Sequence, residues 1–107
     1  MTSRPRAWAR PSEVEAGAAT AEQVNLMRKL AGGTISASDF ATAWLTARRR
    51  ALDDGDRLRN DFDRILTEVF YLLDEYVIDP TLRDSDDMTD EELTRRVQRA
   101  LRELDTL

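Results

Sequence analysis

The chain has 107 residues, and its 21 acidic side chains against 16 basic ones give a formal charge of −5. The absence of histidine and cysteine excludes disulfides, imidazole or thiolate metal sites, and catalytic triads built on those side chains. With 4 glycines and 3 prolines, the composition is poor in turn residues and predicts an all-α domain.

We expect no signal for export or membrane insertion in this sequence. No window offers the run of about 18 apolar residues that a membrane span needs. The segment Met1–Pro11 carries Arg4, Arg6 and Arg10 but is not followed by an apolar segment, so we expect no secretory signal. Together with the lack of cysteine, this predicts a cytoplasmic protein.

The first residues differ in composition from the rest of the chain. Residues 1–19 are rich in Arg, Pro, Ala and Gly and show no sustained periodicity, which predicts a flexible N-terminal tail. Trp8 is the one aromatic residue in this tail, and docking of its side chain on the domain is an alternative. Residues 20–107 are predicted to form the folded domain.

Two helices are predicted in the first half of this domain. Thr20 is the expected N-cap of the first, with Gln23 as its capping-box partner. Gly32-Gly33 ends this helix, because glycine adopts the left-handed backbone conformation without steric cost. The second helix begins after Ser36 and ends in arginines 48–50, where cations favour the helix dipole.

The strongest helical pattern lies in the second half. Apolar residues recur there at the i, i+3, i+4, i+7 spacing, at Leu58, Phe62, Ile65, Leu66, Val69, Leu72, Leu73 and Tyr76. Pro80 ends this helix, and Thr89 opens a fourth one with Glu92 as its capping-box partner. Four amphipathic helices joined mostly by short links predict an antiparallel four-helix bundle.

Negative charge is concentrated in the second half of the chain. Residues 1–52 hold eight basic and four acidic side chains, whereas residues 53–79 hold nine acids and three arginines. The candidate partner-binding residues are the densest part of this region: Asp74, Glu75, Tyr76, Asp79, Asp84, Asp86 and Asp87. A surface of this kind attracts a basic protein and repels nucleic acid.

Each candidate residue also has a simpler explanation. A single acid usually solvates an exposed helix face or caps a helix, although so many close acids oppose the compact state. Tyr76 either belongs to the core or packs its ring while its hydroxyl faces a partner.

These acids do not match a calcium loop. An EF-hand register that starts at Asp84 places Met88 at the fifth ligand position and Arg95 where the bidentate glutamate belongs. We therefore expect no metal and no cofactor. A carboxylate-based metal enzyme is the least favoured function, because no ligand spacing supports it.

Three segments of the chain carry a family resemblance. They are Leu30–Phe40 with its G-x-I-S turn, Val69–Tyr76 with the pattern F-x-x-x-D-x-Y, and Asp79-Pro80-x-Leu82-Arg83, followed by an acidic loop and the helix start Glu91-Glu92-Leu93. In this order they resemble the colicin D immunity protein-like family, small helical inhibitors of bacterial toxin nucleases. The likeness covers about residues 24–105.

The resemblance implies a function. Members of that family have a four-helix fold, are not enzymes, and bind the nuclease domain of a cognate toxin. The toxin is a transfer-RNA-cleaving ribonuclease, and the inhibitor's acids occupy its basic cleft. The positions that the resemblance carries over are Asp74, Tyr76 and Asp79, whereas Asp84, Asp86 and Asp87 are candidates because of their charge density alone.

A small helical DNA-binding regulator or antitoxin adaptor is the alternative function. In that case Arg4, Arg6, Arg10 and arginines 48–50 would contact phosphates. The negative balance of the chain disfavours this function, since non-specific DNA binding needs a continuous basic surface. A salt-dependent shift of duplex DNA would distinguish it from toxin inhibition.

Overall fold

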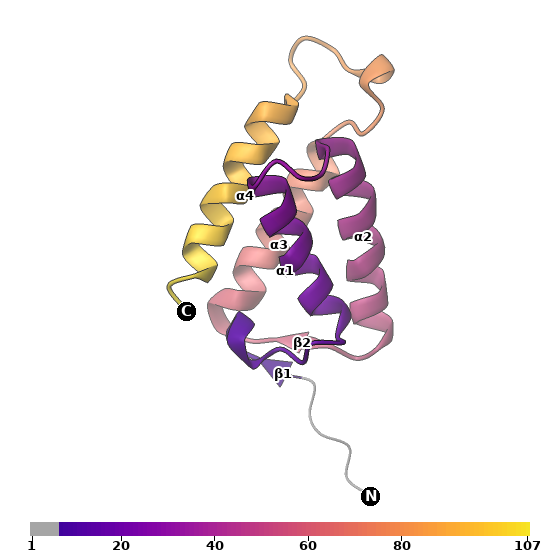
Figure 1. Cartoon of the computed structure of the whole chain (residues 1–107). Coiled ribbons are helices and arrows are strands. Elements are labelled where there is room, and N and C mark those ends of the chain that lie inside the picture. The colour runs from indigo at the N-terminus through magenta and orange to yellow at the C-terminus, as the bar shows by residue number, and fades with distance from the viewer. Residues whose placement is uncertain (1–6) are drawn as a thin grey trace, which may run out of the picture.

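The structure, a computed structural model, describes residues 7–107, and helices account for most of them (Figure 1). The elements are β1 (Ala7–Trp8), η1 (Pro11–Glu13), α1 (Ala19–Ala31), α2 (Ala37–Asp53), β2 (Arg57–Leu58), α3 (Asn60–Glu75), η2 (Pro80–Leu82) and α4 (Asp90–Leu104), where η denotes a 3-10 helix. The predicted all-α class fits these elements, with a two-stranded parallel sheet added. The antiparallel bundle arrangement stays a prediction.

Two of the predicted helix starts are confirmed by their capping hydrogen bonds. Ser36 Oγ accepts from the backbone N–H of Asp39 at 3.1 Å before α2. Thr89 Oγ1 accepts from the N–H of Glu92 at 3.0 Å before α4. Both bonds satisfy a donor that has no partner within the helix.

The start of α1 differs from the prediction. The helix begins at Ala19, and Thr20 lies inside its first turn instead of capping it. The buried Asp56, from the link between α2 and β2, accepts a hydrogen bond from Thr20 Oγ1 at 2.8 Å and one from Thr20 N at 3.4 Å. A carboxylate from a distant segment therefore satisfies a donor at the N-terminus of α1, where the negative charge also favours the helix dipole.

The N-terminal segment differs from the flexible tail expected over residues 1–19. β1 pairs in parallel with β2, with Ala7 opposite Arg57 and Trp8 opposite Leu58, so Leu58 precedes α3 instead of belonging to it. Trp8 is 6% exposed and belongs to the core, which confirms the alternative that it docks on the domain. Burying a tryptophan side chain is strongly favourable and orders the backbone that carries it. Residues 1–6 lie outside the described part, and the domain boundary at residue 20 stays a prediction.

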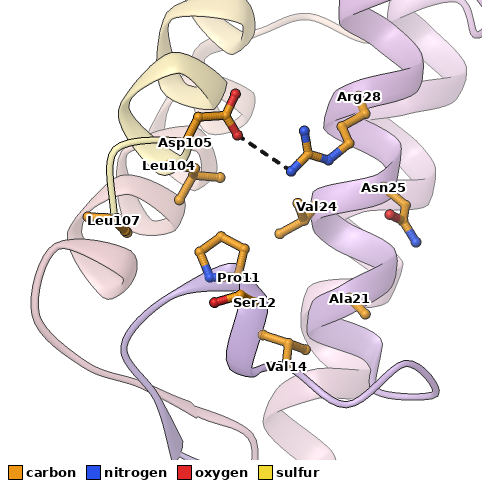
Figure 2. A pocket seen from close by; sticks show the side chains of 10 residues that line it. All are labelled: Pro11, Ser12, Val14, Ala21, Val24, Asn25, Arg28, Leu104, Asp105 and Leu107. Carbon is orange, nitrogen blue, oxygen red and sulfur yellow. Dashed lines mark ion pairs between the residues drawn. The ribbon is translucent and has the colours of Figure 1, made fainter.

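The residues after β1 also pack against the helices. Figure 2 shows Pro11 and Val14 facing Val24 of α1, with Leu104 of α4 on the other side of a shallow pocket. An ion pair of 3.6 Å between Arg28 and Asp105 joins α1 to the C-terminal end of α4 at this pocket. This segment therefore lies against both α1 and the C-terminus.

The core is built from all four helices. α1 packs against α2 and α4, and α4 also packs against α3. The largest fully buried apolar side chains are Met27, Phe40, Trp44, Phe62, Ile65, Val69, Leu93, Val97 and Leu104. None of the helices within residues 7–107 has the length and apolar character required to cross a membrane.

The links between helices lie at two ends of the molecule (Figure 1). The small sheet and the C-terminus lie at one end, and the α1–α2 link and the segment between α3 and α4 lie at the other. We call residues 76–89 the acidic link. Its backbone extends beyond the ends of the helices that it joins.

Candidate functional site

The predicted site begins in the last turn of α3, where Asp74 and Glu75 are both exposed. Consecutive residues of a helix point about 100° apart. Asp74 accordingly lines a groove between α2 and α3, together with Arg48 and Phe70. Glu75 lines a different groove between α3 and α4, together with Arg99. The two acids therefore border different grooves, although they are neighbours in sequence.

Asp79 is exposed and caps the short helix η2. Its Oδ1 accepts hydrogen bonds from Thr81 N at 2.9 Å and from Thr81 Oγ1 at 2.8 Å. These bonds, the one from the Thr81 hydroxyl first, lower the pKa of Asp79 below its usual value, because they stabilise the charged form. The carboxylate is therefore ionised at neutral pH and held in one orientation.

Asp84 and Asp87 are brought together further along the acidic link. Asp87 Oδ2 accepts from the N–H of Asp84 at 2.8 Å, and the N–H of Asp87 donates to the carbonyl of Asp84 at 3.1 Å. Asp86, between them, is exposed. This turn places several carboxylates on a short stretch of ordered backbone.

Tyr76 is placed differently from the partner-facing tyrosine that we considered. It is 4% exposed, and its hydroxyl donates to Asp90 Oδ1 at 2.6 Å and accepts from Arg83. Burial, followed by the hydrogen bond to Asp90, raises the pKa of Tyr76 above its ordinary value. The hydroxyl is thus engaged inside the chain, because a buried polar group needs a partner.

Arg83 is a residue whose role the sequence analysis missed. Its side chain is 17% exposed, and Nη1 lies 2.9 Å from Asp90 Oδ1. Tyr76 and Arg83 belong to two different motifs of the family resemblance. The sequence separation of the two residues does not indicate that their side chains make contact. Arg83 is also the one basic residue of the acidic link, and its ion-pair partner is Asp90, which is not one of the predicted site acids.

The six predicted acids differ from many other acids of the chain in lacking an ion-pair partner. Glu68 and Glu103 pair with Arg64, and Glu92 pairs with Arg96. Within residues 7–107, no cation forms an ion pair with Asp74, Glu75, Asp79, Asp84, Asp86 or Asp87. Within the described residues, no ion pair therefore compensates their negative charge.

Two arginines of the DNA-binding alternative, Arg48 and Arg50, have partners within the described residues. The Arg48 guanidinium lies 3.9 Å from the centroid of the Phe70 ring, and Arg50 pairs with Glu22 at 3.0 Å. Arg4 and Arg6 lie outside the described residues. Arginines 48–50 are thus partly engaged within the fold.

The described residues hold no group of three or more acids, histidines or cysteines with the geometry of a metal site. The pocket of Figure 2 contains none of the predicted site residues. The acidic link and the end of α3 therefore remain the candidate site, and their chemistry is that of binding through carboxylates.

Comparison with protein families decides the class. A family model described as bacterial self-protective colicin-like immunity matches residues 19–104, which is most of the chain. The chain belongs to this family. A search of curated proteins and a search of solved structures gave no significant match. The expected resemblance is confirmed at the level of colicin-like immunity proteins, and the colicin D subtype stays a prediction.

Membership of the colicin-like immunity family implies a toxin-immunity role, in which the chain binds a cognate toxin protein. Proteins of this kind typically act as inhibitors and not as enzymes. The matched region includes every predicted site residue as well as Arg83 and Asp90.

Proposed function

We propose that the chain inhibits a cognate toxin nuclease, a transfer-RNA-cleaving ribonuclease, by placing an acidic surface in the toxin's basic active cleft. The observation that carries this proposal is a group of six acids, at the end of α3 and in the acidic link, that have no ion-pair partner within residues 7–107. Carboxylates accept charge-assisted hydrogen bonds from Arg and Lys, as phosphates do, so they can occupy the place of the RNA backbone. The transfer-RNA target rests on the resemblance to the colicin D immunity protein-like family.

The shape of the fold supports this mode of binding. The acidic link projects beyond the helix ends (Figure 1), so Asp79, Asp84, Asp86 and Asp87 are carried on a part that a cleft can receive. Asp74 and Glu75 would contact the rim of the cleft from α3. Tyr71, which is 61% exposed beside Glu75 in the α3–α4 groove, offers an aromatic contact of the type enriched at interfaces.

The proposal has consequences for location and mechanism. Inhibition of a transfer-RNA-cleaving toxin places the chain in the cytoplasm, with neither nucleic acid nor a membrane as a direct partner. Inhibition by occupation of the cleft requires no catalysis by the chain. We also infer an antiparallel bundle, because short links join α1 to α2 and α2 to α3.

The first test is binding to the polypeptide encoded immediately upstream, followed by an assay of that polypeptide on transfer RNA. We expect a tight complex in which cleavage stops, with an association rate that falls as salt rises, because electrostatic steering is screened. A neighbour without nuclease activity, or a complex that still cleaves transfer RNA, would contradict the proposal. Binding of the chain to duplex DNA would favour the regulator instead.

A further inference from the structure

The Arg83 side chain stabilises the acidic link through contacts on its inner side. Nε donates to the Val77 carbonyl at 2.7 Å, Nη1 pairs with Asp90 Oδ1 at 2.9 Å, and Nη2 donates to the Tyr76 hydroxyl. The guanidinium also lies over the Tyr76 ring, 4.7 Å from its centroid. Arg83 therefore points into the molecule from a segment whose acids are mostly exposed.

This contact set uses the shape of arginine as well as its charge. A guanidinium has five N–H donors in a rigid planar fork and stacks on aromatic rings. Lysine carries the same charge on one ammonium group, which cannot reach a backbone carbonyl, a carboxylate and a phenol in these three directions. Replacement by lysine therefore removes the geometry while preserving the charge.

Two further contacts limit the free length of the link. Ser38 Oγ, from the first turn of α2, donates to the carbonyl of Ile78 at 3.0 Å. Met88, near the start of α4, is buried in the core. Between these two points, the Arg83 side chain ties the middle of the link to its first residues, Tyr76 and Val77, and to Asp90, the first residue of α4. In sequence, Asp79 and Asp87 lie on either side of Arg83.

We propose that Arg83 is a positioning residue, which holds the acidic link in the conformation that presents Asp79, Asp84, Asp86 and Asp87 to the toxin without contacting the toxin itself. This inference rests on the proposed function. A loop that is ordered before binding lowers the entropic cost of association. Affinity differences between variants of one interface lie mostly in the dissociation rate, so the effect of Arg83 should be found there.

The first arm of the test needs no partner. Amide hydrogen exchange is measured on the full chain with Arg83→Lys, at the amides of Thr81, Leu82, Asp84 and Asp87, which are hydrogen-bonded within the link. We expect these amides to exchange about tenfold faster, while the core amides of the helices are unchanged, because the link opens locally. The control is Arg102→Lys, the same replacement at an exposed arginine in the last turn of α4. Equal link exchange in Arg83→Lys and wild type overturns the inference.

The second arm measures binding to the nuclease domain encoded beside this chain. We expect Arg83→Lys to dissociate about tenfold faster with a nearly unchanged association rate, since the net charge is preserved. Tyr76→Phe, which removes one acceptor of Arg83 and keeps the ring, should have a smaller effect. Faster exchange with an unchanged dissociation rate overturns the positioning role.

The two arms separate this inference from the proposed function. If the wild-type chain does not bind the nuclease domain, the proposed function fails, together with the toxin-presenting part of the inference. The exchange measurement still decides whether Arg83 orders the acidic link.

Discussion

The Tyr76 hydroxyl lies 2.6 Å from Asp90 Oδ1, and this hydrogen bond joins the end of α3 to the first turn of α4 across the acidic link. The same carboxylate oxygen pairs with Arg83. Tyr76, Asp90 and Arg83 thus form one polar cluster at the base of the segment that carries most of the predicted acids. A change that disrupts this cluster should therefore also change the positions of the acids in the link.

The Tyr76 hydroxyl should contribute to the stability of the fold. We expect Tyr76→Phe to lower the free energy of unfolding by about 1 kcal/mol, because Asp90 loses a donor and Arg83, whose side chain is 17% exposed, loses an acceptor. The matched control is Tyr71→Phe, whose hydroxyl belongs to a side chain that is 61% exposed and should change stability little. Urea denaturation of both variants checks this, and equal effects of the two changes would contradict the role of Tyr76.

The raised pKa of Tyr76 predicts a pH dependence at the alkaline end. The neutral phenol is favoured in the folded state, first by burial and then by the hydrogen bond to Asp90. This contribution is fully present below the unfolded pKa of about 10 and is lost as the pH rises through the higher folded value. Wild type should therefore lose stability more steeply than Tyr76→Phe when urea denaturation is followed above about pH 10. Parallel curves for the two proteins would show that Tyr76 is not responsible.

The buried carboxylate of Asp56 should be needed at the start of α1. Asp56→Ala leaves the hydroxyl and amide of Thr20 without this acceptor, and we expect a loss of about 1–3 kcal/mol in the free energy of unfolding. Asp54→Ala, at an exposed position in the same link, should change it by less than about 0.5 kcal/mol. Thermal or urea denaturation distinguishes them, and a larger loss for Asp54→Ala would refute the capping role of Asp56.

Charge reversal should separate binding from folding. Asp74→Lys combined with Asp86→Lys changes two exposed acids that form no ion pair within residues 7–107. We expect the affinity for the toxin to fall by about 30-fold or more, the equivalent of about 2 kcal/mol for lost interfacial charge pairs. Helicity and melting temperature should stay nearly unchanged, because neither side chain contributes to the core.

The control for charge reversal is Asp53→Lys combined with Asp54→Lys. These two acids lie at the C-terminal end of α2. This double variant makes the same change in net charge at exposed acids outside the candidate site. Titration of toxin activity on transfer RNA compares the two double variants. Equal loss of inhibition in both would indicate a general effect of net charge, and unfolding of the first would show that its acids are structural.

The elements of the fold could be predicted to different degrees. The caps at Ser36 and Thr89 and the helix over residues 60–75 follow from residues within one or two turns of each other, so the sequence displays them directly. The prediction failed at Thr20, where a good capping residue lies inside the helix. Its partner Asp56 is 36 positions away, and no local rule connects the two.

The candidate site shows the same division. Charge density and the resemblance suffice to predict its acids, since composition and short motifs are properties of the sequence, and their role in binding stays a prediction. These acids are Asp74, Glu75, Asp79, Asp84, Asp86 and Asp87. Neither charge density nor the motifs could predict that the Tyr76 side chain is buried. A tyrosine at the end of an amphipathic helix suits a core or an interface, and only its contacts with Asp90 and Arg83 distinguish them.

By itself the sequence determined the number of α-helices, most of their ends and the acidic character of the second half, because helical periodicity, capping and charge depend on residues close together in the chain. The tertiary structure decided that Trp8 joins the core, that Asp56 caps α1, and that Arg83 points inward against Tyr76. These contacts form only when the helices have packed. Packing brings together side chains that are distant in the sequence, and these contacts determine which groups are buried and which form hydrogen bonds.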